Sequence, residues 1–154
     1  MSKVNTLSLE SNRQIKINFD GGDLSSDAGL LLIKEFVSKI GIDRLFSHSF
    51  KTNDSAAFRY HTDKENLLQM IYMIIAGYFE DDASDELTND PVFKAMLDKE
   101  ALASQPTISR FHNRLDEDSL NQFLSISRIL IKKIYSIQMP EAVILNLDSI
   151  VLDA

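Results

Sequence analysis

The pattern of apolar and polar positions divides the chain into a short strand-like region and a longer helical region. Between residues 4 and 20, apolar residues alternate with polar ones on both sides of a polar turn at residues 10–13, which is the period of a half-buried strand. The stretch Asp20–Asp23 holds two adjacent glycines, and glycine allows the backbone angles of a tight turn. The pattern therefore predicts a β-hairpin in residues 1–24.

After this turn, apolar residues recur every three or four positions, which is the spacing of one helical face. The first such run extends from Leu30 to Ile40, and either Ser25 or Ser26 stands where a helix cap is expected. Gly41 follows the run, and glycine is the usual residue just beyond a helix end. The spacing therefore predicts a first helix that ends at Gly41.

The chain between this helix and residue 79 is predicted to hold the centre of a helical bundle. A short helix at residues 43–47 and a polar loop at 48–61 are expected to come first. Thr62 and Glu65 have the spacing of a capping box, in which each side chain satisfies a backbone donor of the other. The helix behind them, residues 66–79, is apolar on nearly all sides. Because such a helix must be buried, we expect it at the centre of the bundle.

Further helices are predicted before a proline ends the helical region. Pro91 suits the first position of a helix over residues 91–99, where its missing N–H is no loss. A helix over residues 105–115 also carries a proline in its first turn. The last helix opens with three acidic residues and carries a wide apolar stripe over residues 119–137. Pro140 is expected to end it.

The final apolar run, residues 142–147, suits a strand that is covered on both faces, and it leads to Asp148. A strand that brings a carboxylate to a sheet edge needs partner strands, so we expect the chain to be the front part of a larger protein. The predicted fold is mainly α with a small N-terminal β-hairpin. Its predicted regions are the hairpin at 1–24, a helical region at 25–139 and the start of an α/β domain at 140–154.

The charge of the chain is uneven. The net charge of −7 argues against a general binder of polyanions. Residues 78–100 hold eight acidic residues and two lysines, whereas residues 104–138 hold five basic and three acidic residues. Most of the acidity is thus confined to one segment, and the segment after it is mildly basic.

Composition also bears on the compartment. The chain has no cysteine, which fits a reducing cytosol and excludes a disulfide framework. The N-terminus lacks an apolar signal region. The longest apolar run, residues 70–79, is shorter than the roughly 20 residues of a membrane span. We therefore expect a cytoplasmic protein with no membrane partner.

Asp148 is the first candidate for chemistry. A rigid strand fixes a carboxylate at its end, and Mg²⁺ prefers such hard oxygen ligands. Two such ions can activate a hydroxyl or water and stabilise the leaving oxygen of a phosphodiester. The alternative is that Asp148 caps a following turn or helix, which residues and spacing alone do not exclude.

The helices at 91–99 and 105–115 form the second candidate, because two short helices with a tight connection match a helix-turn-helix. The second helix carries residue types that contact phosphates and base edges. These candidate DNA-binding residues are Thr107, Ser109, Arg110, Asn113 and Arg114. The alternative is a solvated helix face within a bundle. The acidic segment upstream would repel DNA, so it must point elsewhere if the helix binds DNA.

Four stretches in order carry a resemblance to a known family. They are residues 20–32 (DGGDLSSDAGLLL), 75–93 (with IAGY, DEL and NDPVF), 102–111 (LASQPTISRF) and 143–149 (VILNLDS). Together they resemble the N-terminal third of a DDE transposase of bacterial insertion sequences, in the branch called group 1 of the DDE domain. The resemblance covers nearly the whole chain, and the four ordered motifs are more specific than any one of them.

The resemblance implies a ribonuclease-H-like catalytic domain whose first strand lies in residues 140–154. Family members bind Mg²⁺ through two Asp and one Glu, cut the ends of the element and join them to target DNA. The first Asp of this set falls on Asp148, and the other two ligands would lie beyond Ala154. The resemblance therefore implies a truncated transposase. We expect the chain to be inactive alone and to bind Mg²⁺ weakly, because one carboxylate does not hold a two-metal site.

Two positions depart from the family pattern. Asn146 stands where family members usually have Asp, and Ile150 stands where they usually have Thr. By the same resemblance, the helical region 25–139 would bind transposon-end DNA or pair with a second copy as a homodimer.

Two other functions stay open. One is a non-catalytic dimerisation or regulatory module of a transposition system, in which the apolar stripe of the last helix buries against a partner. The other is a helical phage or regulatory protein unrelated to transposition.

Overall fold

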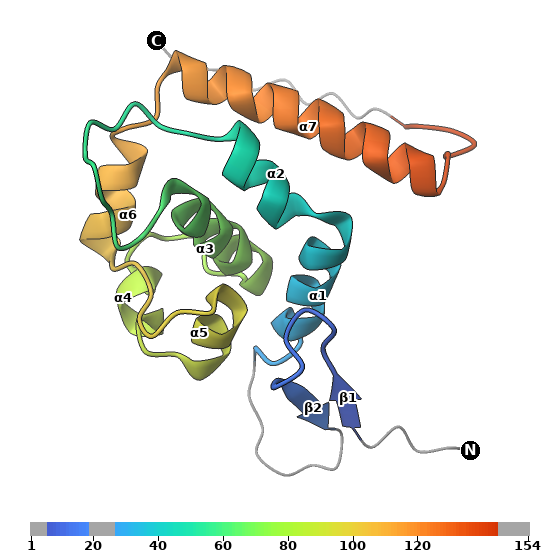
Figure 1. The fold of residues 1–154 in the computed structure, drawn as a ribbon, viewed down its shortest axis with the longest axis horizontal. Helices are drawn as coiled ribbons and strands as arrows, with labels where there is room; N and C mark the ends of the chain where they lie inside the picture. The colour runs from blue at the N-terminus through green and yellow to red at the C-terminus, as the bar shows by residue number, and fades with distance from the viewer. Residues whose placement is uncertain (1–5, 19–26, 145–154) are drawn as a thin grey trace.

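A computed structural model gives the fold of residues 6–18 and 27–144. In the described part of the chain, a β-hairpin lies beside a group of helices, and one long helix, α7, lies along an edge of that group (Figure 1). None of the described helices has both the length and the hydropathy that a membrane crossing requires.

The N-terminal hairpin consists of β1 (Thr6–Ser8) and β2 (Lys16–Asn18), which pair antiparallel with Leu7 opposite Ile17. Leu9, at the end of β1, is buried in the core. The turn is held to the first helix by Ser11, whose N–H and hydroxyl both donate to the Glu35 carboxylate, at 3.0 and 2.7 Å. The predicted hairpin is confirmed.

The first two helices are α1 (Leu30–Ile40) and α2 (Ile42–Ser49), and Gly41 separates them. Gly41 has a left-handed backbone, with φ of +71°, which ends α1 as predicted. The candidate caps Ser25 and Ser26 lie outside the described residues. The predicted short second helix is also confirmed, and it is slightly longer than the spacing indicated.

Helix α3 (Asp63–Ala76) is the centre of the bundle, and it packs against α1, α2, α5 and α6. The predicted capping box is present: Thr62 Oγ1 accepts from the Glu65 N–H, and Glu65 Oε2 accepts from the Thr62 N–H. The prediction that the whole helix is buried is wrong at its C-terminal end, where Ile74 and Ile75 are half exposed. An all-apolar sequence shows what a helix could bury, but the neighbouring helices cover only part of α3.

The next helices are α4 (Ala83–Leu87), α5 (Pro91–Leu97) and α6 (Gln105–His112). Pro91 begins α5 as predicted, and Asp90 caps it by accepting from the N–H groups of Val92 and Phe93. Helix α5 packs against α1 and α3, whereas α6 packs against α3 and α4. The helix-turn-helix therefore stays a prediction.

A buried lysine ties α1 to the end of α5. The Lys34 side chain is almost fully buried, donates to the Ala95 carbonyl at 2.6 Å and pairs with Asp98 at 2.8 Å. Asp98 ends α5 in a left-handed conformation, with φ of +52°. The Lys34 ammonium thus satisfies a carbonyl of the last turn, where a helix favours positive charge.

Helix α7 (Glu117–Ile137) is capped by Asp116, which forms a capping box with Ser119. It lies across α2 (Figure 1). Its inner side carries the buried Ile126 and the partly buried Phe123, whose ring lies 4.6 Å from that of Phe50. Much of its predicted apolar stripe is exposed.

The predicted buried strand at 142–147 is not formed in its described part. Residues 142–144 have no regular secondary structure, and the side chains of Val143 and Ile144 are exposed. The described sheet consists of β1 and β2 alone, so it offers no neighbour to such a strand. Residues 145–154 lie outside the described residues, and the ribonuclease-H-like domain stays a prediction.

Two glycines provide a matched test of the backbone. Gly77 ends α3 with a left-handed φ of +92°, whereas Gly29 precedes α1 with an ordinary backbone, and a Cβ would meet no atom within 4 Å at either site. Gly77→Ala is expected to lower the free energy of unfolding by about 1–2 kcal/mol, because the left-handed region strains a residue with a Cβ. Gly29→Ala is expected to leave it unchanged or raise it slightly. Urea unfolding measures the free energy of unfolding of both variants. Equal changes in the two would contradict the left-handed conformation of Gly77.

Candidate nucleic-acid interface

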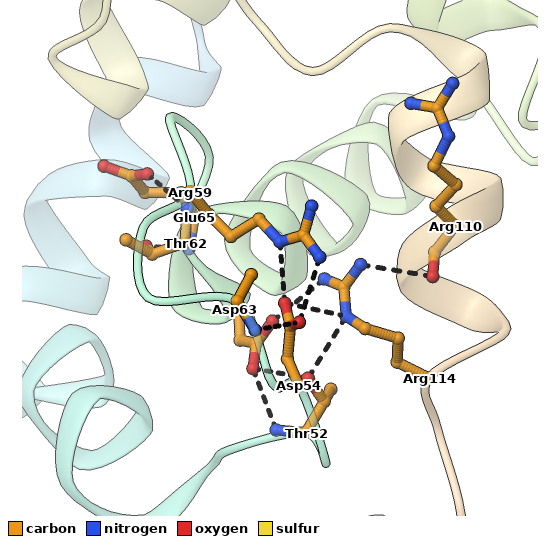
Figure 2. Close-up of polar contacts among 9 residues, drawn as sticks. Thr52, Asp54, Arg59, Thr62, Asp63, Glu65, Arg110 and Arg114 are labelled. Atoms are coloured by element: carbon orange, nitrogen blue, oxygen red, sulfur yellow. Dashed lines mark hydrogen bonds and ion pairs between the residues drawn. The ribbon is translucent and has the colours of Figure 1, made fainter.

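The surface that carries most of the candidate DNA-binding residues lies where α6 meets the loop at residues 50–61. Arg114, just after α6, pairs with the Asp63 carboxylate at 3.1 Å and with that of Asp54 at 3.5 Å (Figure 2). Its Nε also donates to Thr52 Oγ1 at 3.3 Å. Only 17% of the Arg114 side chain is exposed. Arg114 is therefore a brace that joins the loop, α3 and α6.

The Asp63 carboxylate is the centre of this brace. Besides Arg114, it accepts hydrogen bonds from the Thr52 N–H at 2.8 Å and from the Thr52 hydroxyl at 2.7 Å. Asp63 is the first residue of α3, where the helix dipole favours a negative charge. The start of the loop is thereby fixed to the start of α3.

A second ion pair closes the loop on itself. Arg59 donates from Nε and Nη2 to the two oxygens of Asp54, at 2.7 and 2.9 Å (Figure 2). These hydrogen bonds, with one from the Ala56 N–H, hold the pKa of Asp54 far below its usual value. The pairing also raises the pKa of Arg59. Asp54 and Arg59 were not candidates from the sequence, because an Asp and an Arg in a polar loop carry no distinctive spacing.

Arg110 differs from Arg114, although only one helical turn separates them. Its carbonyl accepts from Arg114 Nη1 at 3.2 Å, while its guanidinium points away from the Asp54 and Asp63 carboxylates (Figure 2). Arg110 is exposed, and within the described chain its guanidinium has no ion pair or hydrogen bond. Of the two candidate DNA-binding arginines, Arg114 is thus paired within the fold, and Arg110 carries an uncompensated charge at the surface.

The five candidate residues, two of which follow the end of α6, do not all line the same hollow. Thr107, Arg110 and Arg114 line one side of a hollow of about 170 Å³, whose other lining residues are Arg59, Tyr60, His61 and Asn66. Ser109 and Asn113 do not line it. The sequence did not indicate the lining residues outside α6, because they come from the loop and from α3.

His61 and Thr107 are polar members of this lining. Partial burial, with a smaller effect from Lys99, lowers the pKa of His61 and so favours its neutral form. The Thr107 hydroxyl lies 3.2 Å from that of Ser104. Lys99 lies over the Tyr60 ring at 4.5 Å and donates to the Tyr60 carbonyl at 2.7 Å.

The acidic segment borders the other side of α6. Asp85, in α4, accepts from the Gln105 N–H at 2.8 Å, and Asp81 lies 3.3 Å from His112 Nδ1. Helix α6 therefore has an acidic neighbour on one side and the hollow on the other. A DNA-binding α6 requires the acidic segment to point away from the DNA. This requirement is met on the side with the hollow, whereas the opposite side of α6 contacts the acidic segment.

Comparison with family models gives one match, the transposase DDE domain group 1, over residues 7–154. The chain belongs to this family. The resemblance predicted from the four motifs is thereby confirmed, and the family links the chain to transposition. Searches of curated proteins and of solved structures gave no significant match.

Members of this transposase family generally use Mg²⁺. In the part of the chain that the structure describes, no three His, Cys, Asp or Glu side chains are grouped as metal ligands. Asp148 lies outside the described residues. The described donors thus do not fit a Mg²⁺ site, and no catalytic step follows from them.

The unequal roles of the two arginines can be tested through stability. Arg114→Ala leaves Asp63 and Asp54 without their shared partner in a partly buried site, and it is expected to lower the free energy of unfolding by about 1–3 kcal/mol. Arg110→Ala is expected to change it by less than about 0.5 kcal/mol, as for an exposed side chain. Urea denaturation of both variants checks this. Equal losses would mean that Arg114 does not brace the loop.

Proposed function

We propose that the chain binds transposon-end DNA through the α6 face that carries Thr107 and Arg110. Membership of a transposase family supports DNA as the ligand. The observation that carries the choice of face is the exposed, unpaired Arg110 beside an Arg114 that two carboxylates neutralise. Arginine binds phosphates and base edges in a fixed geometry, so an accessible guanidinium on a braced helix suits this role.

The charge around α6 determines which side the DNA approaches. The α4 side carries Asp81 and Asp85 next to the helix, and these carboxylates repel phosphates. The opposite side carries Arg110, and Asn113 follows it at the exposed helix end. Because the net charge is −7, the chain as a whole repels DNA, and only this local surface attracts it. The affinity is therefore modest and falls with salt.

The remaining sequence-based predictions belong to the same proposal. Residues 25–139 form the DNA-binding or dimerisation region, and residues 140–154 begin the catalytic domain. Asp148 is the first of its metal ligands. The family match over residues 7–154 supports this assignment.

Fluorescence anisotropy with a labelled 30-base-pair duplex tests the proposed face. Arg110→Ala is expected to weaken binding several-fold and to reduce the slope of log affinity against log salt by about 1, because one phosphate contact is lost. Arg44→Ala is the matched control, since it removes an exposed arginine from α2, and it should leave the affinity nearly unchanged. Equal losses in both variants, or no binding by the wild type, would refute the proposal.

A second function, homodimerisation, is favoured by the outer face of α7. Exposed apolar side chains recur there at alternating steps of three and four residues, interrupted at Ser127, as in a coiled-coil seam. They are Leu120, Leu124, Ile131 and Ile134, and each is about half exposed. A second copy carries the same seam, so two copies can bury these residues against each other around a two-fold axis.

Light scattering of matched variants tests the dimer. Leu124→Glu places a charge in the seam and is expected to convert the dimer to a monomer. Ile129→Glu introduces the same charge at another half-exposed isoleucine of α7, outside the seam, and should leave the dimer intact. If the wild type is a monomer at a concentration of about tens of micromolar, homodimerisation is excluded as its function.

A further inference from the structure

The tip of the 50–61 loop carries an aromatic ring that the described fold leaves uncovered. Phe58 is 80% exposed, and the two residues before it, Ala56 and Ala57, are exposed as well. Because alanine side chains are small, they leave most of the Phe58 ring accessible to a ligand. A single exposed apolar residue is common on protein surfaces, so its significance depends on how the ring is held and on what surrounds it.

The loop around Phe58 is held in one shape by the Asp54 carboxylate. This carboxylate accepts from the Ala56 N–H at 3.0 Å and from Arg59 Nε and Nη2 at 2.7 and 2.9 Å. These contacts close residues 54–59 into a small ring of chain with Phe58 near its end. A side chain that is already held in its bound position loses little conformational entropy when it binds.

The chain after Phe58 is fixed as well. Lys99 donates to the Tyr60 carbonyl at 2.7 Å, and its ammonium lies 4.5 Å from the centre of the Tyr60 ring. The same ammonium pairs with the Glu65 carboxylate of α3 at 3.1 Å. Phe58 thus stands between two anchored stretches of backbone.

The hollow beside the loop offers a ligand its rim rather than its interior. Asn66 lines it, but the Asn66 amide is fully buried and has no hydrogen-bond partner among the described residues, so it does not reach a ligand in the hollow. The exposed lining residues are Arg59, Tyr60 and Arg110. Phe58 precedes Arg59 in the chain, so its ring lies at this rim.

A second exposed phenylalanine shows that exposure alone does not select a site. Phe79, just after α3, is 76% exposed. Three acidic residues follow it at positions 80–82, and these carboxylates repel phosphates. Phe58 lies instead beside a hollow whose described lining holds three arginines and no acidic residue, one of them the unpaired Arg110. Of these two rings, Phe58 is the one that a DNA strand can approach.

The chemistry of the ring determines the kind of contact. A phenylalanine has no polar atom, so it contacts the faces of bases and not their edges. Base–aromatic stacking depends little on sequence. Proteins that bend DNA insert such apolar side chains between base steps and kink the duplex by about 20–90°. A fixed, protruding ring beside an accessible arginine suits this second kind of contact.

We propose that Phe58 inserts between neighbouring base pairs of the bound DNA and bends the duplex, while Arg110 contacts a phosphate. The proposal rests on the proposed DNA-binding function and gives it a specific contact. Insertion costs the unstacking of one base step, so the ring favours DNA that is already poorly stacked. It also adds a contact that salt does not screen, which suits a chain with a net charge of −7.

Two duplexes of the same sequence test the wedge, one fully paired and the other with a central C·C mismatch. Each has about 20 base pairs, which is about 68 Å at 3.4 Å a base pair, and each carries a donor and an acceptor dye at its two ends. The wild type is expected to raise the energy transfer of both duplexes at saturation, because the bend brings the ends closer. It is expected to bind the mismatched duplex about tenfold more tightly, since less stacking is lost.

Phe58→Ala is expected to lose both the rise in energy transfer and the preference for the mismatch. Its affinity for the paired duplex should change by less than about threefold, because the lost stacking is offset by the unstacking that no longer occurs. Its melting temperature should equal that of the wild type, because the ring is exposed. Phe58→Trp keeps an aromatic ring and should retain the bend and the preference.

Phe79→Ala is the matched control, since it removes an equally exposed ring from the acidic side, and it should behave as the wild type does. Arg110→Ala should weaken binding to both duplexes while retaining the bend at saturation. The wedge is wrong if Phe58→Ala keeps the bend and the preference, or if Phe79→Ala loses them equally. It is also wrong if Phe58→Ala alters only the oligomeric state in light scattering, because the ring then belongs to a protein interface.

The outcomes distinguish this proposal from the one on which it rests. If the wild type binds both duplexes with equal affinity and no bend, DNA binding stands and the wedge is refuted. If it binds neither duplex, the proposed DNA-binding function fails, and the wedge fails with it.

Discussion

The paired contact of Arg114 with Asp63 and Asp54 is the constraint on which the described surface depends. One guanidinium joins three segments: the loop at residues 50–61, the start of α3 and the end of α6. Because the side chain is largely buried, solvent screens these charges less than it would at the surface. The hollow beside Asn66 has its walls on these same segments, so its shape follows from the brace.

The same contact explains how an acidic chain can offer a place for DNA. Two carboxylates are neutralised by arginines, which leaves the charge of Arg110 uncompensated on the exposed side of α6. On the other side, Asp85 satisfies a backbone donor at the start of the helix. The acidic residues thus help to hold α6 in place, and they also restrict the approach of a polyanion to one side.

The local features of the fold were predictable from the sequence. The long-range contacts of particular side chains were not. The hairpin, the capping box at Thr62 and the proline start of α5 depend on neighbouring residues alone. In contrast, Arg114 and Asp63 are 51 positions apart, so no local pattern distinguishes Arg114 from Arg110. The unpaired amide of Asn66 is likewise invisible in a sequence. The periodicity of α7 showed an apolar stripe but could not show how much of it the fold covers.

The central claim is that DNA contacts the side of α6 that carries Arg110 and the hollow. An amide-resolved NMR titration of the ¹⁵N-labelled chain with a 30-base-pair duplex tests it directly, because it reports every backbone site and the side-chain amides at once. We expect the largest shifts to lie in α6 and in the 50–61 loop, and we expect them to diminish as salt is added. Shifts confined to α4, α7 or the hairpin would contradict it.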